Sequence, residues 1–195
     1  MKPLAGIVFA LLLFSGILPG TTPLLSPRAV KTLVISGEFG FTGQAGDLYE
    51  PSATVTFSPA LSILVARGLA VGAVLDISAT GIRDYGGSTT LAFGPQVLYF
   101  FSPLQRPEKI PGGIYPFLGG GVRFYSDSAT NGFHYAATGY QIPLSAGLVV
   151  MVSRNTGLFI RAFYSLEHLK NEDTGEGFQG NRYGLTAGFG LFRYR

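Results

Sequence analysis

The sequence predicts an all-β protein, an eight-stranded antiparallel up-and-down transmembrane β-barrel, and two observations lead to that class. Hydrophobic residues make up 47% of the 195 residues and charged residues only 13%, whereas a water-soluble surface carries about a quarter to a third charged residues. From Leu69 to Ile77, Leu, Val, Ala, Leu and Ile alternate with Ala, Gly, Val and Asp. This period of two is typical of a strand with one face in lipid and the other in a polar lumen.

The rival membrane class, a helical one, lacks its main requirement. After the N-terminal segment, no stretch approaches the roughly 20 continuous apolar residues that a spanning helix needs. A closed barrel is the other backbone that satisfies its own hydrogen bonds within lipid. A soluble β-sandwich is the remaining alternative, and it has less reason to exclude charge from one face of every strand.

The N-terminus predicts an exported chain. Lys2 precedes an apolar run from Leu4 to Leu18, which has the charge and length of a signal peptide. We therefore expect a signal peptide over 1–20, a short periplasmic tail over 21–31 and the barrel over 32–195. The chain has no cysteine, which excludes disulfides and thiolate metal sites.

Eight segments follow the period-two pattern. The predicted strands are 32–42, 54–65, 69–78, 90–101, 114–125, 141–152, 158–168 and 182–192. Strands of about ten residues, tilted by about 40°, cover the roughly 25 Å apolar band of an outer-membrane barrel. The connections 66–68 and 153–157 are tight, and in such barrels tight turns lie on the periplasmic side. The long connection 102–113 breaks this rule.

One face of these strands carries no charged residue, as contact with lipid requires. The residues predicted to face lipid are Leu33, Ile35, Phe39, Phe41, Val55, Phe57, Leu61, Ile63, Val65, Leu69, Val71, Leu75, Ile77, Leu91, Phe93, Val97, Tyr99, Ile142, Leu144, Leu148, Val150, Leu158, Ile160, Tyr164, Leu185, Phe189 and Leu191. Aromatic residues gather toward strand ends, which predicts interfacial girdles. One girdle contains Tyr99, Phe100, Phe101, Tyr115, Phe117 and Tyr194, and the other Tyr49, Tyr85, Tyr125, Phe133, Tyr135, Tyr140 and Phe178.

The opposite face carries three acidic and three basic residues, so the predicted lumen is neutral. They are Glu38, Asp76, Arg123, Arg161, Glu167 and Arg182. Eight strands enclose a space just wide enough for side chains to fill, so we expect a packed network of ion pairs rather than a pore. Glu38 on the first strand and Arg182 on the last are a candidate pair across the closing seam. Ion or solute conduction is the alternative interpretation of the same six residues.

The loops predicted to face outward carry seven acidic residues against two basic ones. The acids are Asp47, Glu50, Asp84, Asp127, Glu172, Asp173 and Glu176. Such loops could hold divalent cations against lipopolysaccharide, although solvated loop charges are the simpler interpretation. Despite a net charge of +3, the basic residues form no stripe with stacking aromatics, so we expect no nucleic-acid partner.

Three stretches of the chain carry a family resemblance. The stretches VTFSPALSILVARGLAVGAVLDIS, LAFGPQVLYFF and IYPFLGGGVRFYS follow one another as in the small OmpA/OmpX-type outer-membrane β-barrel family, which the chain resembles over about 160 residues. The resemblance implies an eight-stranded, porin-like barrel assembled by the outer-membrane insertion machinery, with roles that range from envelope integrity to adhesion. The chain departs from the usual assembly signal because it ends in RYR rather than in an aromatic residue.

Catalytic candidates are few. His134 and His168 are the only histidines, too few for a histidine-rich metal site. The stretch EHLKN is similar to one in the lipid A deacylases, where a serine nucleophile follows the histidine by two residues, but Lys170 stands at that place here. Ser165 could complete a serine–histidine–carboxylate arrangement, although it is poorly placed. We predict no catalytic residue, no metal site and no cofactor.

Together these observations predict a monomeric, non-enzymatic protein of the cell outer membrane, with a structural, envelope-integrity or surface-adhesion role exerted through its extracellular loops. Its expected partners are outer-membrane lipid, lipopolysaccharide and the insertion machinery, with an extracellular ligand that the loops do not identify. A lipid A deacylase-like hydrolase and a narrow passive channel are the alternatives.

Overall fold

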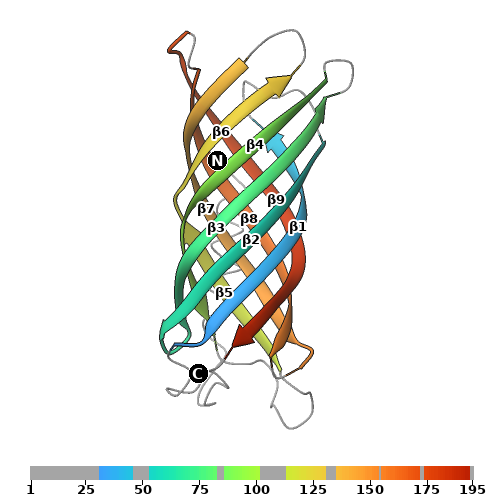
Figure 1. The fold of residues 1–195 in the computed structure, drawn as a ribbon, viewed down its shortest axis with the longest axis vertical. Coiled ribbons are helices and arrows are strands. Elements are labelled where there is room, and N and C mark those ends of the chain that lie inside the picture. Colours follow the sequence, from blue (N-terminus) through green and yellow to red (C-terminus); the bar gives the residue numbers. More distant parts are fainter. Residues whose placement is uncertain are drawn as a thin grey trace.

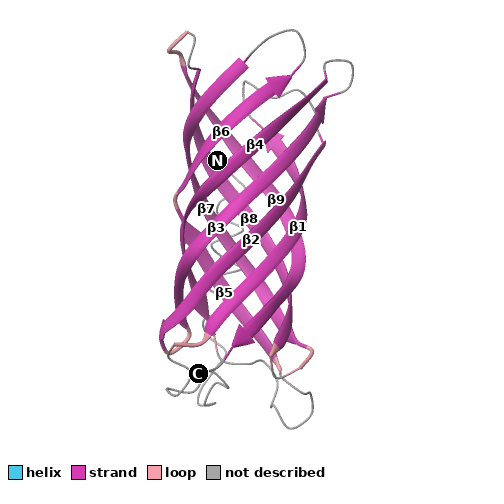
Figure 2. Ribbon diagram, viewed as in Figure 1, coloured by secondary structure: helices cyan, strands magenta, loops and turns pink. Residues whose placement is uncertain are grey.

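The structure, a computed structural model, describes residues 31–45, 53–82, 86–101, 113–130, 135–153, 155–171 and 174–193. The predicted signal peptide 1–20 and residues 21–30 of the predicted tail lie outside these ranges. Strands and turns account for the described chain, and Figure 2 shows no helix in it. Accordingly, no described helix is long and apolar enough to cross a membrane.

The strands are antiparallel to their neighbours and close into a barrel (Figure 1). They are β1 (Leu33–Ala45), β2 (Ala53–Ala66), β3 (Leu69–Ile82), β4 (Gly86–Phe100), β5 (Ile114–Gly121), β6 (Arg123–Thr130), β7 (Tyr135–Met151), β8 (Thr156–Asn171) and β9 (Gly177–Arg193). Sequential strands pair around the wall, and β1 pairs with β9 to complete the closure. The predicted closed antiparallel architecture is confirmed.

The segments β5 and β6 are two halves of one barrel strand. The pairing register with β4 is the same on both sides of Val122, and so is the register with β7. Pro95 of β4 and Pro143 of β7 lie beside this break, and a proline has no N–H to donate to a ladder. The nine segments therefore form eight barrel strands, as the sequence predicts.

The strands extend further at the loop end than their apolar pattern predicts. β7 begins at Tyr135 rather than at 141, β8 ends at Asn171 rather than at 168, and β9 begins at Gly177 rather than at 182. A hydrogen-bonded ladder needs no apolar side chain, so it continues after the apolar alternation ends. The connections at this end shrink to 46–52, 83–85, 131–134 and 172–176. Most of their predicted acidic residues lie outside the described ranges.

The other end of the barrel holds the start of β1, the end of β9 and two tight turns (bottom of Figure 1). Gly68 in the β2–β3 turn has a φ of 75°, a conformation that favours glycine. A Cβ there would also lie 2.5 Å from the carbonyl oxygen of Phe100, so the turn needs glycine for two reasons. The β4–β5 connection at this end is long, and its residues 102–112 lie outside the described chain.

The outer wall is apolar. All residues predicted to face lipid are exposed or partly exposed, and none is buried. Phe41 is 76% exposed and Leu185 is 65% exposed. Among the strand side chains that the structure describes, outward-facing charge occurs only near strand ends, at Lys170 and Arg193. The belt between them presents the uncharged surface that lipid requires.

The belt gives a first prediction. Leu185 lies at the middle of β9, so Leu185→Arg should destabilise the barrel in lipid vesicles by about 2–4 kcal/mol, measured from urea unfolding. Leu185→Ala, the matched control, should cost much less because it places no charge in lipid. Equal unfolding midpoints for the two variants would contradict a lipid-facing belt.

A candidate functional site in the barrel lumen

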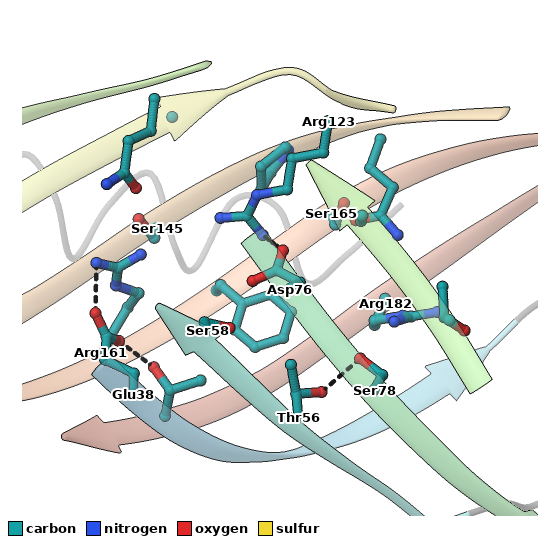
Figure 3. A pocket seen from close by; sticks show the side chains of 18 of the residues that line it. Glu38, Thr56, Ser58, Asp76, Ser78, Arg123, Ser145, Arg161, Ser165 and Arg182 are labelled. Carbon is teal, nitrogen blue, oxygen red and sulfur yellow. Dashed lines mark hydrogen bonds and ion pairs between the residues drawn. The ribbon is translucent and has the colours of Figure 1, made fainter. Parts of the chain in front are cut away.

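The six predicted lumen charges project into the barrel interior and form three ion pairs. Figure 3 shows Arg161 beside Glu38, and Arg123 beside Asp76. The two glutamates are the most deeply buried members, with Glu38 2% and Glu167 3% exposed. Burial of such charges is tolerated only when they are paired, and each of the six has an oppositely charged partner.

The pair at the closing seam differs from the predicted one. Nη2 of Arg161 on β8 lies 2.7 Å from Oε1 of Glu38 on β1, which means that the pair reaches across β9. The hydroxyl of Thr186 on β9 donates to Oε2 of Glu38 at 2.6 Å. The predicted pairing of Glu38 with Arg182 is therefore wrong, because Arg161 and Thr186 occupy both carboxylate oxygens.

Glycine makes the reach across β9 possible. Gly188 stands opposite Glu38 in the β1–β9 register, and a Cβ on it would overlap the backbone of Gly37 and Glu38. Because Gly188 has no side chain beside Glu38, the Arg161 side chain can reach Glu38 over β9 next to Thr186.

The other two pairs lie over different strands. Arg123 on β6 pairs with Asp76 on β3, which spans β4 at the small residue Ala92. Arg182 on β9 lies 2.9 Å from Glu167 on the adjacent strand β8. The three pairs thus connect β1 with β8, β3 with β6, and β8 with β9.

Uncharged polar side chains continue the network over β2, β3 and β4. The amide of Gln96 donates to the hydroxyl of Ser62 at 3.1 Å, a contact that passes over Gly72 of the strand between them. The hydroxyls of Thr56 and Ser78 lie 3.0 Å apart across adjacent strands. These bonds satisfy side chains that the lumen buries.

A cavity of about 40 Å³ lies among these side chains (Figure 3). It is large enough for about three water molecules, because one water needs about 10–15 Å³ of such space. Two buried oxygens at its wall, Oδ1 of Asp76 and Oγ of Ser165, have no hydrogen-bond partner within the described chain. The cavity is therefore suited to water or an ion-sized guest, and it is far too small for a larger solute.

An aromatic plug fills the lumen at the end of the tight turns. It consists of Val34, Leu64, Ala70, Leu98, Phe100, Tyr115, Phe117, Val149, Met151, Phe159 and Phe192. The rings of Phe159 and Phe192 stack with an interplanar angle of 5° and centroids 6.0 Å apart. The guanidinium of Arg161 lies 5.3 Å from the centre of the Phe117 ring, which joins the plug to the charge network through a cation–π contact.

The prediction of an interfacial girdle at the turn end is wrong for three of its residues. Phe100, Tyr115 and Phe117 are buried in the lumen rather than placed at the lipid interface. The sequence contains the evidence for this inward direction, because Phe100 is four residues from the lumen residue Gln96 on the same strand and therefore points to the same face. Tyr99 and Tyr140 stand next to the inward-facing residues Phe100 and Gln141, so they point outward, and both are exposed on the outer wall as predicted.

A smaller apolar cluster lies on the other side of the charge network, toward the loop end. It contains Ala92, Tyr125, Ala137 and Leu169, with Phe178 packed against them. Tyr125 was also predicted to belong to a girdle, and it is 5% exposed instead. The polar layer of the lumen thus has the aromatic plug on its turn side and this cluster on part of its loop side, where the hydroxyls of Thr54 and Thr80 also face the lumen.

The catalytic candidates do not come together. Ser165 faces the lumen and is 1% exposed, whereas His168 faces outward and stacks on Tyr140 with ring centroids 5.3 Å apart. The barrel wall separates the two side chains, and His134 lies outside the described residues. Within the described ranges, no group of three or more His, Cys, Asp or Glu could hold a metal ion.

Closure of the sheet, the uncharged outer belt and the filled lumen define the class: a small eight-stranded β-barrel of the transmembrane type. The sequence matches no protein-family model, and a search of curated proteins finds no relative. The likeness to known proteins is one of fold.

Several solved structures share this fold, and three of them are compared below. The crystal structure of Neisserial surface protein A (NspA) has a TM-score of 0.58 and 15% identity, over 82% of this chain and 96% of that one. The solid-state NMR structure of the outer membrane protein AlkL in DMPC lipid bilayers has a TM-score of 0.55 and 13% identity, over 91% and 96%. The crystal structure of the outer membrane protein OprG from Pseudomonas aeruginosa has a TM-score of 0.54 and 11% identity, over 86% and 98%.

The seam gives a second prediction. Arg161→Leu leaves the Glu38 carboxylate buried with Thr186 as its remaining partner, which should lower the free energy of unfolding by about 3–5 kcal/mol. The double variant Glu38→Gln/Arg161→Leu removes both charges and should recover part of this loss. Urea unfolding in lipid vesicles measures both, and a single variant as stable as the wild type would contradict the ion-pair network.

Proposed function

We propose that the chain is a monomeric integral protein of the cell outer membrane whose role is structural or adhesive rather than catalytic. The observation that carries the proposal is the arrangement of the lumen, in which a neutral polar layer lies between an aromatic plug and a second apolar cluster. Such an interior supports the wall and offers no route for a solute. The protein would then act through its outer wall and its extracellular loops.

The lumen weighs against the narrow-channel alternative. The rings of Phe117 and Phe159 are 1% and 0% exposed, and they pack 5.9 Å apart at the turn end. An ion that crossed this layer would lose its hydration without gaining a polar partner, which is costly in an apolar site. The three ion pairs above it would also have to separate.

The placement of Ser165 and His168 on opposite sides of the wall weighs against the hydrolase alternative. A serine nucleophile needs its general base within hydrogen-bond reach. Lys170, at the place of the deacylase serine, is exposed on the outer wall with His168 and is no substitute for a hydroxyl nucleophile. A non-catalytic role requires none of these contacts.

The belt and the similar folds support the proposed location. OprG and AlkL are outer membrane proteins by name, and the latter structure was determined in lipid bilayers. An outer-membrane barrel of this kind would use the insertion machinery for assembly and would contact lipopolysaccharide around its outer end. The loop end would then face the exterior, since the tight turns face the periplasm.

Deletion of the gene tests the role. A deletion strain should become more sensitive to detergent, leak periplasmic protein or lose surface adhesion, and the wild-type gene should restore it. A complementing gene with Ser165→Ala should restore it equally, because the proposed role uses no serine nucleophile. A deletion strain unchanged in all three assays would contradict the proposal.

Planar bilayer recordings test the filled lumen separately. The purified barrel should show no steady open conductance, because the aromatic plug and the ion pairs leave no continuous aqueous path. A water-filled porin recorded in the same bilayers serves as the positive control. A steady and reproducible conductance of the wild-type barrel would favour the narrow channel instead.

A further inference from the structure

A groove of about 290 Å³ crosses β7, β8 and β9 near the loop end. Its outward-facing side chains are Tyr140, Ile142, Leu166, His168, Gln179 and Asn181. We call it the wall groove. It lies outside the lumen and is separate from the charge network.

The wall groove marks the point where the wall changes from apolar to polar. Along β8 toward the loop end, the outward side chains change from Leu166, 50% exposed, to His168 and then Lys170. Along β7 toward the loop end, the outward side chains change in the same way, from Leu144 and Ile142 to Tyr140. The lower part of the groove is therefore continuous with the lipid-facing belt, and its upper part carries hydrogen-bonding groups.

On β1 and β2, the outward side chains that the structure describes near the loop end are apolar. There the outward side chains near the loop end are Phe41, 76% exposed, and Val55, 50% exposed. A surface that only had to meet lipid chains would need no more than this. Small polar side chains also face outward at Thr89 of β4 and Ser126 of β6, but the wall groove brings a phenol, an imidazole and two amides together.

The register brings the polar groups into one cluster. Tyr140, His168 and Gln179 stand directly opposite one another on the three strands, and Asn181 is opposite Leu166 in the next row. The stacked rings of Tyr140 and His168, with an interplanar angle of 27°, form a flat wall on one side. Gln179 and Asn181 supply amide donors and acceptors on the other.

The charge of the wall groove favours an anion. Lys170 is the next outward-facing residue after His168 on β8, toward the loop end, and it is exposed. Glu167 contributes to the floor, but its carboxylate is turned inward and paired with Arg182 at 2.9 Å. The outward groups of the groove and Lys170 are thus an ammonium, an imidazole, two amides and a phenol, all of which can donate hydrogen bonds to a phosphate or a hydroxyl. The exposed carboxylate of Glu176 lies beyond Lys170 on the loop side, next to Gly177, outside the groove.

We propose that the wall groove binds the phosphorylated sugar headgroup of an outer-leaflet glycolipid, the lipid A part of lipopolysaccharide. An acyl chain lies along Ile142 and Leu166, a sugar ring packs against the Tyr140–His168 wall, and Lys170 pairs with a phosphate. This assignment rests on the proposed outer-membrane location for its biological meaning. The binding itself can be measured on the isolated protein.

Native mass spectrometry of the purified full-length barrel, released from detergent with lipid A added, tests the assignment. The wild type should retain one tightly bound lipid A. His168→Leu/Asn181→Leu should weaken that binding by about tenfold or more, because it removes two hydrogen-bonding groups. Lys170→Gln, at an exposed position that cannot disturb packing, should weaken it by about threefold.

The matched control is Thr89→Leu/Ser126→Leu, which replaces two outward-facing polar residues on β4 and β6, away from the groove. It should bind lipid A like the wild type. Equal binding by all variants would overturn the assignment, and so would phosphatidylglycerol bound as tightly as lipid A and lost in the same variants. Loss of acyl chains from the lipid A, seen in the same spectra, would contradict the non-catalytic function and leave the groove assignment standing.

Discussion

The narrow interior of an eight-stranded barrel is the constraint on which the rest of this structure depends. Each charge that faces the lumen must find its partner within the space that side chains fill. The chain meets this requirement by placing a small residue on the strand between two partners. Gly188 lies beneath the reach of Arg161 to Glu38, Ala92 beneath Arg123 to Asp76, and Gly72 beneath Gln96 to Ser62. Contacts of this kind join strands that share no backbone hydrogen bond, so they hold the closed cross-section together.

The apolar layers and the ion pairs depend on each other. The aromatic plug limits access of water from the turn end, which strengthens the pairing of the charges above it. The plug in turn uses lumen glycines for space, since a Cβ on Gly147 would come within 2.7 Å of the Phe117 ring. The contact of Arg161 with Phe117 belongs to both layers. A substitution in one layer is therefore expected to affect the other.

Because the interior is occupied, the chemistry available to partners lies on the outer surface. The belt fixes the barrel in lipid, and the loop end carries the connections that face away from the tight turns. The wall groove lies where these two surfaces meet, with apolar side chains on one side and hydrogen-bonding groups on the other. The proposed lipid would meet both kinds of surface at once, its acyl chain on the apolar side and its headgroup on the polar side.

The sequence by itself determined the face of each residue, because side-chain direction alternates along a strand wherever the strand lies. That local rule predicted the eight strands, the lipid-facing belt and the inward direction of Glu38, Asp76, Arg123, Arg161, Glu167 and Arg182. The same rule contained the inward direction of Phe100 and Phe117, which the girdle interpretation missed. Only the tertiary structure decided that Glu38 meets Arg161 rather than Arg182, that Ser165 and His168 are separated by the wall, and that the aromatic rings gather in one plug. These contacts depend on strand register and stagger, which closure of the whole barrel sets and no single segment encodes.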